Sequence, residues 1–348
     1  MPKKKKGGKK GKKGPAIDLE AEGFNPAVVG KNYKAMCKQI GLEPNARVVN
    51  AIEPSGDDDG PKPQWMTIDN EDGPIGVPHT VALCKALLGN PATCADLAGG
   101  PYQTLQSLRI WRCNIGDDGA VAVAEMLKLG AEKMNLTYVE LLDNHIGVRG
   151  CAALGAALDC QPHPSKVVTL NLDYNDGIGC EGAKALCQGL LSNPVLKQLH
   201  LRYCGIGPMG ALAIAQVISM PACAIHNLDL LGNVVGVEGL RKLSDGLRRT
   251  KAVKTLDLAD NRIAGDVESL AHFSRALMTN QSLTHVDLNY NHLGIEGALA
   301  LQPALDKENK RIEVFKVDSS LPTEIFQSLY REGGGGGKKG KKGKKKKK

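Results

Sequence analysis

The 348-residue chain contains no long apolar run and few aromatic residues. No stretch approaches the roughly 18 consecutive apolar residues of a membrane-spanning helix, and the first residues lack the apolar core of a secretory signal. Pro2 stands where N-myristoylation needs glycine. These absences argue against the common routes into or onto a membrane, so we expect an intracellular, cytoplasmic protein without a membrane span.

The sequence also lacks the short motifs of common enzymes. It contains no G-x-x-x-x-G-K-[ST] phosphate loop, no H-E-x-x-H, no G-x-S-x-G and no cysteine and histidine spacing typical of zinc sites. The ten cysteines fall mostly in the helices and turns of a repeat, where a small thiol packs well. We therefore expect a non-enzymatic protein that needs no cofactor or metal ion.

An acidic run at residues 57–59 suggests a calcium loop. A helix-loop-helix calcium loop beginning at Asp57 would need glycine at Lys62 and glutamate at Ile68. Because neither is present, we interpret this segment as an exposed linker.

The most prominent feature that is present is a phrase of the form L-x-x-L-x-L-x-x-N-x-I-G-x-x-G, followed by an alanine- and leucine-rich run. It recurs in steps of 28 to 31 residues. The second leucine of each copy falls at Leu108, Val139, Leu170, Leu199, Leu228, Leu256 and Val286. A strand and a helix of this size cannot bury their apolar faces alone and must stack on their neighbours. The period predicts an α/β leucine-rich-repeat solenoid, a horseshoe with parallel strands on the concave face and helices on the convex face.

Each position of the repeat has a physical task. Leu199 and Leu201 alternate with polar residues, which places both leucines inward from a strand. The asparagine that follows, such as Asn144 or Asn233, stands where the chain leaves the sheet, and its amide can bond backbone groups that the turn leaves unpaired. Cys113 and Cys204 replace it in two copies. The alanine- and leucine-rich run after the turn has helical spacing.

The composition divides the chain into five segments. We expect a disordered basic tail at 1–14, a helical lead-in and acidic loop at 15–60, a solenoid of about eight repeats plus a degenerate cap at 61–320, a capping helix at 321–332 and a second disordered basic tail at 333–348. In the lead-in, Tyr33, Met36, Cys37 and Ile40 recur at helical spacing, which predicts a short helix docked on the first repeat.

The two tails hold 17 of the 45 basic residues and no acidic residue, which leaves 28 basic against 37 acidic residues between them. Lysine and glycine offer nothing apolar to bury, so the tails should remain flexible cationic arms. Their possible targets are nucleic acid, an anionic membrane surface and the acidic tails of tubulin. The lysines of the arms are Lys3, Lys4, Lys5, Lys6, Lys9, Lys10, Lys12, Lys13, Lys338, Lys339, Lys341, Lys342, Lys344, Lys345, Lys346, Lys347 and Lys348.

The period and the N-x-I-G-x-x-G-A-x-A-L pattern resemble the ribonuclease-inhibitor-like leucine-rich repeats over residues 61–320. That class includes ribonuclease inhibitor, the Ran GTPase-activating protein and several ciliary proteins, and the resemblance implies a protein-binding scaffold. The Y-x-x-x-C-x-x-x-G-L-x-P pattern of the lead-in, from Tyr33 to Pro44, looks like that of leucine-rich-repeat proteins of cilia and flagella. The lysine and glycine tails look like those of flagellar axonemal proteins.

Candidate binding residues are the outward positions of the strands. The residues between the paired leucines depart most from the common L-D-L phrase in the early repeats, and aromatic residues, only 4% of the chain, gather two or three positions later. Aromatic and arginine side chains are typical of interface hot spots. The alternative is that these rings pack against neighbouring turns. The candidates are Arg109, Trp111, Arg112, Glu140, Asn171, Tyr174, His200, Arg202 and Tyr203.

We therefore expect an interaction scaffold of the ciliary or flagellar axoneme, with tails that contact an anionic lattice such as microtubules. One alternative is a nuclear or nucleolar adaptor whose tails bind RNA, although arms without aromatic or arginine residues are poorly suited to reading bases. A GTPase regulator is a more distant alternative, because the Ran GTPase-activating proteins carry an acidic carboxy-terminal tail and this chain carries polylysine.

Overall fold

The computed structural model describes residues 25–53, 64–71, 73–89, 97–159, 165–306 and 309–333. These residues form a single sheet whose strands follow one another in chain order, all parallel except the last. The strands are β1 (Trp65–Ile68), β2 (Ser107–Ile110), β3 (Tyr138–Glu140), β4 (Thr169–Asn171), β5 (Gln198–His200), β6 (Asn227–Asp229), β7 (Thr255–Asp257), β8 (His285–Asp287), β9 (Val314–Lys316) and β10 (Arg331–Glu332).

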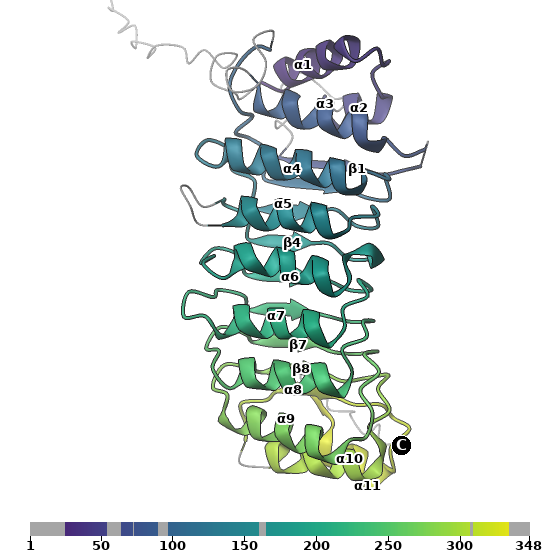
Figure 1. Cartoon of the computed structure of the whole chain (residues 1–348), viewed down its shortest axis with the longest axis vertical. Helices are drawn as coiled ribbons and strands as arrows, with labels where there is room; N and C mark the ends of the chain where they lie inside the picture. The colour runs from purple at the N-terminus through teal and green to yellow at the C-terminus, as the bar shows by residue number, and fades with distance from the viewer. Residues whose placement is uncertain are drawn as a thin grey trace, which may run out of the picture.

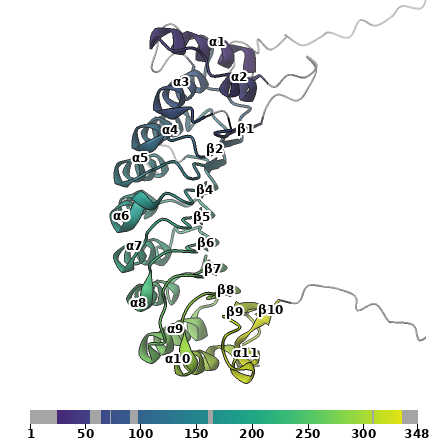
Figure 2. The ribbon, with the colours of Figure 1, turned by 90° about the vertical axis from the view of Figure 1, so that its right-hand side faces the viewer.

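A helix follows each of the strands from β1 to β8, and the helices stack in a second layer (Figure 1). These are α3 (Gly76–Leu88), α4 (Gly116–Gly130), α5 (Val148–Leu158), α6 (Gly179–Leu190), α7 (Pro208–Ser219), α8 (Gly236–Leu247), α9 (Val267–Thr279) and α10 (Gly294–Leu301). Seen from the side, the molecule is a gentle arc with the strands on the inner curve and the helices on the outer curve (Figure 2). The predicted leucine-rich-repeat solenoid is confirmed.

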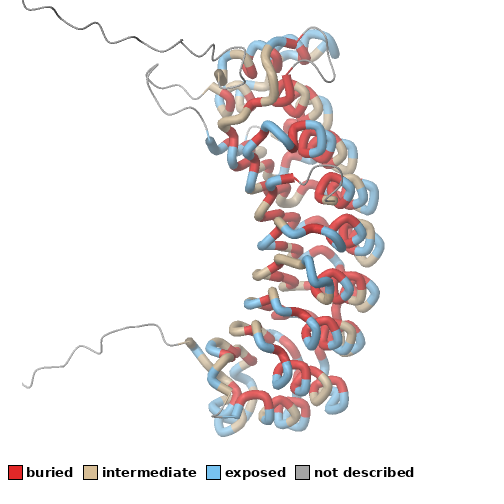
Figure 3. The backbone as a smooth tube through the Cα atoms, turned by 90° about the vertical axis from the view of Figure 1, so that its left-hand side faces the viewer, coloured by how far each residue is buried: buried red, intermediate tan, exposed pale blue. Residues whose placement is uncertain are grey.

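The core lies between the two layers. The repeat markers pair directly across the sheet, as in Leu170↔Leu199 and Leu199↔Leu228, and all of them are buried. Along the tube, buried residues face the space between strands and helices, whereas exposed residues gather on the outer helices and at the turns (Figure 3). Each repeat therefore buries its apolar residues against its two neighbours, as expected for stacked units.

The turn asparagines join neighbouring repeats. The carboxamide oxygen of Asn175 accepts hydrogen bonds from the backbone N–H groups of Asn144 (2.9 Å) and Ile146 (3.0 Å) in the preceding repeat. Its Nδ2 group donates to the carbonyl oxygens of Leu141 and Leu172, both at 2.9 Å. In one of the two copies with cysteine, the Cys204 thiol lies 3.3 Å from the carbonyl oxygen of Leu172. The role predicted for the asparagines is confirmed.

Glycine permits the closest approach of two outer helices. A Cβ atom on Gly189 of α6 would collide with the carbonyl oxygen of Gly155 in α5. The two helices can therefore pack backbone against backbone at this point, which no larger residue would allow.

Two helices close the N-terminal end, α1 (Pro26–Gln39) and α2 (Ala46–Ile52). Tyr33, Met36 and Cys37 of α1 are buried, and the Tyr33 hydroxyl lies 2.9 Å from Nδ1 of His79 in α3, so the helix docks on the first repeat as predicted. Ile40 is exposed, contrary to its expected place on the apolar face, because the helix ends at residue 39. The sequence reasoning missed α2, although Asn45 caps its first turn through Oδ1.

The C-terminal end differs from the predicted capping helix at 321–332. Helix α11 spans only Thr323–Leu329, and residues 331–332 form β10, antiparallel to β9. Strand β10 covers the edge of the sheet, where unpaired backbone groups would otherwise face water. The Arg331 guanidinium attaches β10 to the segment before β9 by donating hydrogen bonds to the carbonyl oxygens of Asn309 (2.6 Å) and Ile312 (2.8 Å).

Within the described ranges, no helix is long and apolar enough to cross a membrane, and no group of His, Cys, Asp or Glu side chains could hold a metal ion. The two lysine tails and the acidic linker at 54–63 lie outside the described residues.

Candidate protein-binding surface on the concave face

The third residue of each strand from β1 to β9 belongs to one lateral row across the concave face, called the central row below. The strand register places these residues side by side, so each one lies next to its counterpart in the following repeat. The row runs through Thr67, Arg109, Glu140, Asn171, His200, Asp229, Asp257, Asp287 and Lys316.

At the N-terminal end of the central row, Glu140 is buried and fully engaged. It accepts hydrogen bonds from the Tyr138 hydroxyl (3.1 Å) and from Nδ2 of Asn171 (3.1 Å). The Arg109 Nε atom is 3.6 Å from the Glu140 carboxylate, and its guanidinium carbon lies 4.9 Å from the centroid of the Tyr138 ring. Glu140 and Asn171, both predicted as contact residues, therefore hold neighbouring side chains in place.

In the middle of the face, Arg202 connects two acidic residues. Its Nε atom is 2.6 Å from the Asp229 carboxylate and 4.0 Å from that of Asp173, and Nδ1 of His200 is 3.5 Å from Asp229. Burial alone would raise the pKa of Asp229, but hydrogen bonds from His200 and Arg202 outweigh it and hold that pKa below its usual value. Burial raises the pKa of Asp173. Arg202 is thus partly occupied by internal ion pairs, and the His200 ring by its contact with Asp229.

Asp257 lies next to Asp229 and Asp287 in the central row. Burial, reinforced by these two carboxylates, raises its pKa to about 6, although the Ala259 N–H donates to it at 3.0 Å. The concave face is therefore acidic from β6 to β8, before Lys316 pairs with Asp287 at 3.0 Å.

A second lateral row, called the turn row, follows the strands. Its residues have left-handed backbone conformations, with φ between 51° and 73°. From Arg112 to Asp260, each N–H in this row donates to a carbonyl oxygen of the next repeat, as in Asp143 to Asp173 (3.0 Å) and Tyr174 to Arg202 (2.8 Å). The row contains Arg112, Asp143, Tyr174, Tyr203, Gly232, Asp260 and Tyr290.

Tyrosine in the turn row lowers the stability of the fold for two reasons: its backbone conformation is unfavourable, and much of its ring is exposed to water. A left-handed conformation costs a residue with a Cβ atom roughly 1–2 kcal/mol, and Tyr174 and Tyr203 leave 50% and 37% of their surface exposed. The two rings stack with centroids 4.9 Å apart. The Tyr203 ring also covers Gly232, where a Cβ atom would collide with it. The alternative that rings pack on neighbouring turns thus describes Tyr203 in part, whereas Tyr174 lies at the open end of the stack.

A cleft of about 320 Å³ adjoins Tyr174 at this open end. It is lined by Trp111, Arg112, Glu140, Leu142, Asp143 and Tyr174, and we call it the Trp111 cleft. The Trp111 Nε1 atom is buried and has no hydrogen-bond partner among the described residues, so the accessible part of this half-buried side chain is carbon. The cleft therefore combines apolar walls with charged groups at its rim.

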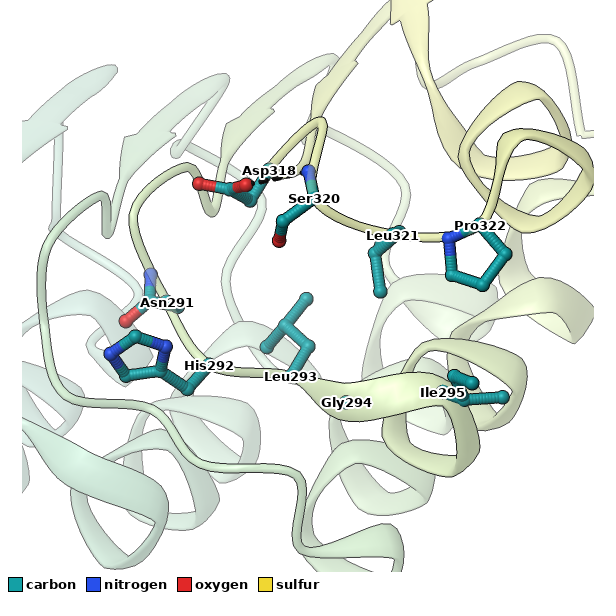
Figure 4. Close-up of a pocket in the computed structure, with 9 residues that line it drawn as sticks. All are labelled: Asn291, His292, Leu293, Gly294, Ile295, Asp318, Ser320, Leu321 and Pro322. Atoms are coloured by element: carbon teal, nitrogen blue, oxygen red, sulfur yellow. Dashed lines mark hydrogen bonds between the residues drawn. The ribbon is translucent and has the colours of Figure 1, made fainter.

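A larger cleft of about 440 Å³ lies at the C-terminal end, between the turn at 291–295 and the loop at 318–322. The side chains of Leu293 and Leu321 point into it from opposite sides (Figure 4). Asp318 folds back on its own loop, where it accepts a hydrogen bond from the Ser320 N–H at 2.8 Å. This cleft lies far along the chain from the residues selected by the sequence analysis.

Known proteins share this architecture. A family model described as Leucine Rich repeat matches residues 103–124, 132–155, 163–187, 192–215 and 279–301. Mouse ribonuclease inhibitor is 28% identical over 229 residues, which cover 64% of this chain and 48% of that protein. The chain is a ribonuclease-inhibitor-like leucine-rich-repeat protein. Repeats of this class indicate a protein-interaction scaffold, and they serve in general as non-enzymatic interaction modules.

Other relatives of this leucine-rich-repeat protein are much longer. Mouse NACHT, LRR and PYD domains-containing protein 14 is 27% identical over 212 residues, 60% of this chain and 20% of that protein. The bovine Tonsoku-like protein is 29% identical over 213 residues, 59% of this chain and 15% of that protein. Among solved structures, leiomodin-1 actin-binding site 2 covers 47% of this chain and 92% of its own, with 19% identity and a TM-score of 0.37.

The structure of this leucine-rich-repeat protein brings the nine predicted contact residues onto one face, where they divide into two groups. Arg109, Glu140, Asn171, His200 and Arg202 belong to ion-pair and hydrogen-bond networks, whereas Trp111, Arg112, Tyr174 and Tyr203 surround or adjoin the Trp111 cleft.

The sequence analysis missed three contributors to this surface. Asp143 and Leu142 line the cleft, and Asp229, which belongs to the common L-D-L phrase of the repeat, anchors Arg202. Aligning the repeats at Gly232 would have identified the left-handed position that Asp143 and Tyr174 share.

Proposed function

We propose that the concave face around the Trp111 cleft docks a protein partner. The observation that carries this proposal is the pair of exposed, stacked tyrosines in left-handed turn positions beside the cleft. Strained backbone and exposed aromatic surface both cost stability, and residues of this kind gather where proteins bind ligands. Tyrosine and tryptophan are also the residues that contribute most to interface energies.

We further propose that the protein acts in the ciliary or flagellar axoneme, where the lysine tails contact an anionic lattice such as microtubules. This part rests on the sequence: the lead-in from Tyr33 to Pro44 and the lysine and glycine tails resemble those of axonemal proteins. Attraction between lysine arms and an acidic lattice needs no apolar anchor and weakens as salt rises.

Localisation in a ciliated cell tests the axonemal role. A tagged full-length chain is expected along the axoneme, and removal of residues 1–14 and 334–348 should weaken that signal because the electrostatic contact is lost. Signal in the nucleolus that disappears with the tails would contradict the axonemal role and favour the alternative of an RNA-binding adaptor.

A further inference from the structure

The aromatic stack on the concave face ends at Tyr174, which lines one edge of the Trp111 cleft. Tyr203 and Tyr174 occupy successive positions of the turn row with ring centroids 4.9 Å apart, close to the spacing of adjacent strands. The preceding position holds Asp143, whose side chain is too short to cover the Tyr174 ring. The Trp111 cleft lies at this position, between Arg112 on one side and Tyr174 on the other. One layer of the stack is thus missing.

The lining of this gap is amphipathic. Trp111, Leu142 and the Tyr174 ring supply carbon surface, while Arg112, Glu140 and Asp143 supply one positive and two negative charges. Glu140 is already bound by Tyr138 and Asn171. The Asp143 side chain makes no ion pair or hydrogen bond within the described part of the chain, although its residue is only partly exposed. The carboxylate that remains available to a bound group is therefore that of Asp143.

We propose that an arginine side chain of the partner protein fills the gap. Its planar guanidinium would stack on the open face of Tyr174 as the next layer and bind the Asp143 carboxylate through paired N–H donors. Lysine is a compact, strongly hydrated charge that stacks poorly, and an aromatic ring would leave Asp143 unpaired.

The surroundings of the cleft favour a basic partner segment. Along the central row, Asp229, Asp257 and Asp287 follow on β6 to β8. Arg202 pairs with Asp229 and Lys316 with Asp287, so among the described residues Asp257 is the carboxylate of the three that has no ion pair. Basic residues flanking the docked arginine would meet this acidic surface, which assists encounter and orientation. The inference rests on the proposed docking function and names the chemistry of its partner.

Trp111 provides a direct reporter for this contact. The chain contains two tryptophans, and Trp65 is 71% exposed at the start of β1, so Trp65→Phe leaves Trp111 as the sole indole without touching the core. Blocked pentapeptides Gly-Ala-Arg-Ala-Gly, with lysine or phenylalanine in place of arginine as controls, are titrated into the full-length W65F protein. The arginine peptide should change Trp111 emission in a saturable way and bind at least about fivefold tighter than the lysine peptide.

Two variants of W65F identify the contacts. Asp143→Asn and Tyr174→Asn should each weaken the arginine peptide about fivefold or more. Asp260→Asn is the matched control, because Asp260 occupies the same left-handed turn position three repeats beyond Tyr174 and outside the cleft; it should leave binding unchanged. Equal binding of the lysine peptide, tighter binding of the phenylalanine peptide, or full binding to Asp143→Asn would each overturn the assignment.

These results separate the arginine contact from the docking function. If Tyr174→Asn abolishes capture of a cellular partner while no arginine peptide binds, docking stands and the arginine assignment fails. If Tyr174→Asn leaves both capture and peptide binding unchanged, both proposals fail.

Discussion

At the scale of single residues, the turn asparagines are polar side chains that lie buried in the core. Asn233 is buried, its Oδ1 accepts from the N–H groups of Cys204 and Ile206, both at 3.0 Å, and its Nδ2 donates to the Leu201 (2.7 Å) and Leu230 (2.8 Å) carbonyl oxygens. A buried amide is tolerable only because its donors and acceptors are satisfied in this way.

Replacement of Asn233 should therefore strongly destabilise the fold. Asn233→Ala leaves the N–H groups of Cys204 and Ile206 and the Leu201 carbonyl oxygen without this partner, whereas the Leu230 carbonyl oxygen keeps Nδ2 of Asn261 at 2.8 Å. We expect a loss of about 3 kcal/mol in the free energy of unfolding. Chemical denaturation measures it. The matched control is Asn289→Ala, because the Asn289 side chain makes no hydrogen bond in the described structure. A loss no larger than that of the control would contradict the role given to the asparagines.

The raised pKa of Asp257 predicts a pH-dependent cost of folding. Its pKa rises to about 6 in the folded protein, so the fold favours the protonated form; the associated stability is present at low pH and is lost as pH rises through about 6. Asp257→Asn removes that cost. The variant should melt about 2 °C above the unsubstituted protein at pH 7.5, with a smaller difference at pH 4. A melting difference that grows toward pH 4 would show the opposite sign of the shift.

At the scale of elements, α1 and α2 cap the N-terminal end of the solenoid. The Tyr33 hydroxyl contacts Nδ1 of His79 at 2.9 Å and accepts from the Asn45 N–H at 3.2 Å, so one buried side chain joins α1, α2 and α3. Asn32 adds a reciprocal pair of bonds to Ala98, at 2.9 and 3.0 Å. A first repeat without this cover would expose its apolar surface to water.

Removal of the Tyr33 hydroxyl should loosen this cap without disturbing the central repeats. In Tyr33→Phe, the half-buried Asn45 N–H loses its acceptor and His79 keeps the contact of its Nδ1 atom with the Cys37 thiol at 3.9 Å, at a cost of about 1–2 kcal/mol. Amide hydrogen exchange should accelerate in α1 and α2 and remain unchanged in α6 to α8, because repeats are coupled chiefly to their nearest neighbours. Uniform acceleration along the whole chain would mean that the solenoid unfolds as one unit.

At the scale of the whole molecule, the repeat period was sufficient to predict the architecture. The positions of Leu199, Leu201 and the turn asparagine recur in each repeat, and only stacked strands and helices bury all of these side chains together. Helix α2 and strand β10 escaped prediction because neither belongs to the repeat. The contact surface was predicted only in part. Side chains such as Arg202 and Glu140 find their partners across repeats, 27 and 31 residues away, and such pairings depend on the strand register.

The proposed docking surface consists of Tyr174 and the adjoining cleft. Asparagine tolerates the left-handed backbone better than tyrosine, so Tyr174→Asn removes the ring without straining the turn. Tyr290→Asn is the matched control: Tyr290 has the same conformation, with φ 59°, and is 70% exposed, but it lies four repeats beyond Tyr174.

The decisive measurement is quantitative capture of partners from ciliated-cell extract by the two variants, with melting temperatures recorded for both. We predict that Tyr174→Asn loses at least about tenfold of the captured partner, that Tyr290→Asn retains it, and that neither variant melts appreciably lower than the unsubstituted protein. Full capture by Tyr174→Asn, or an equal loss with Tyr290→Asn, would contradict the claim that this end of the concave face binds the partner.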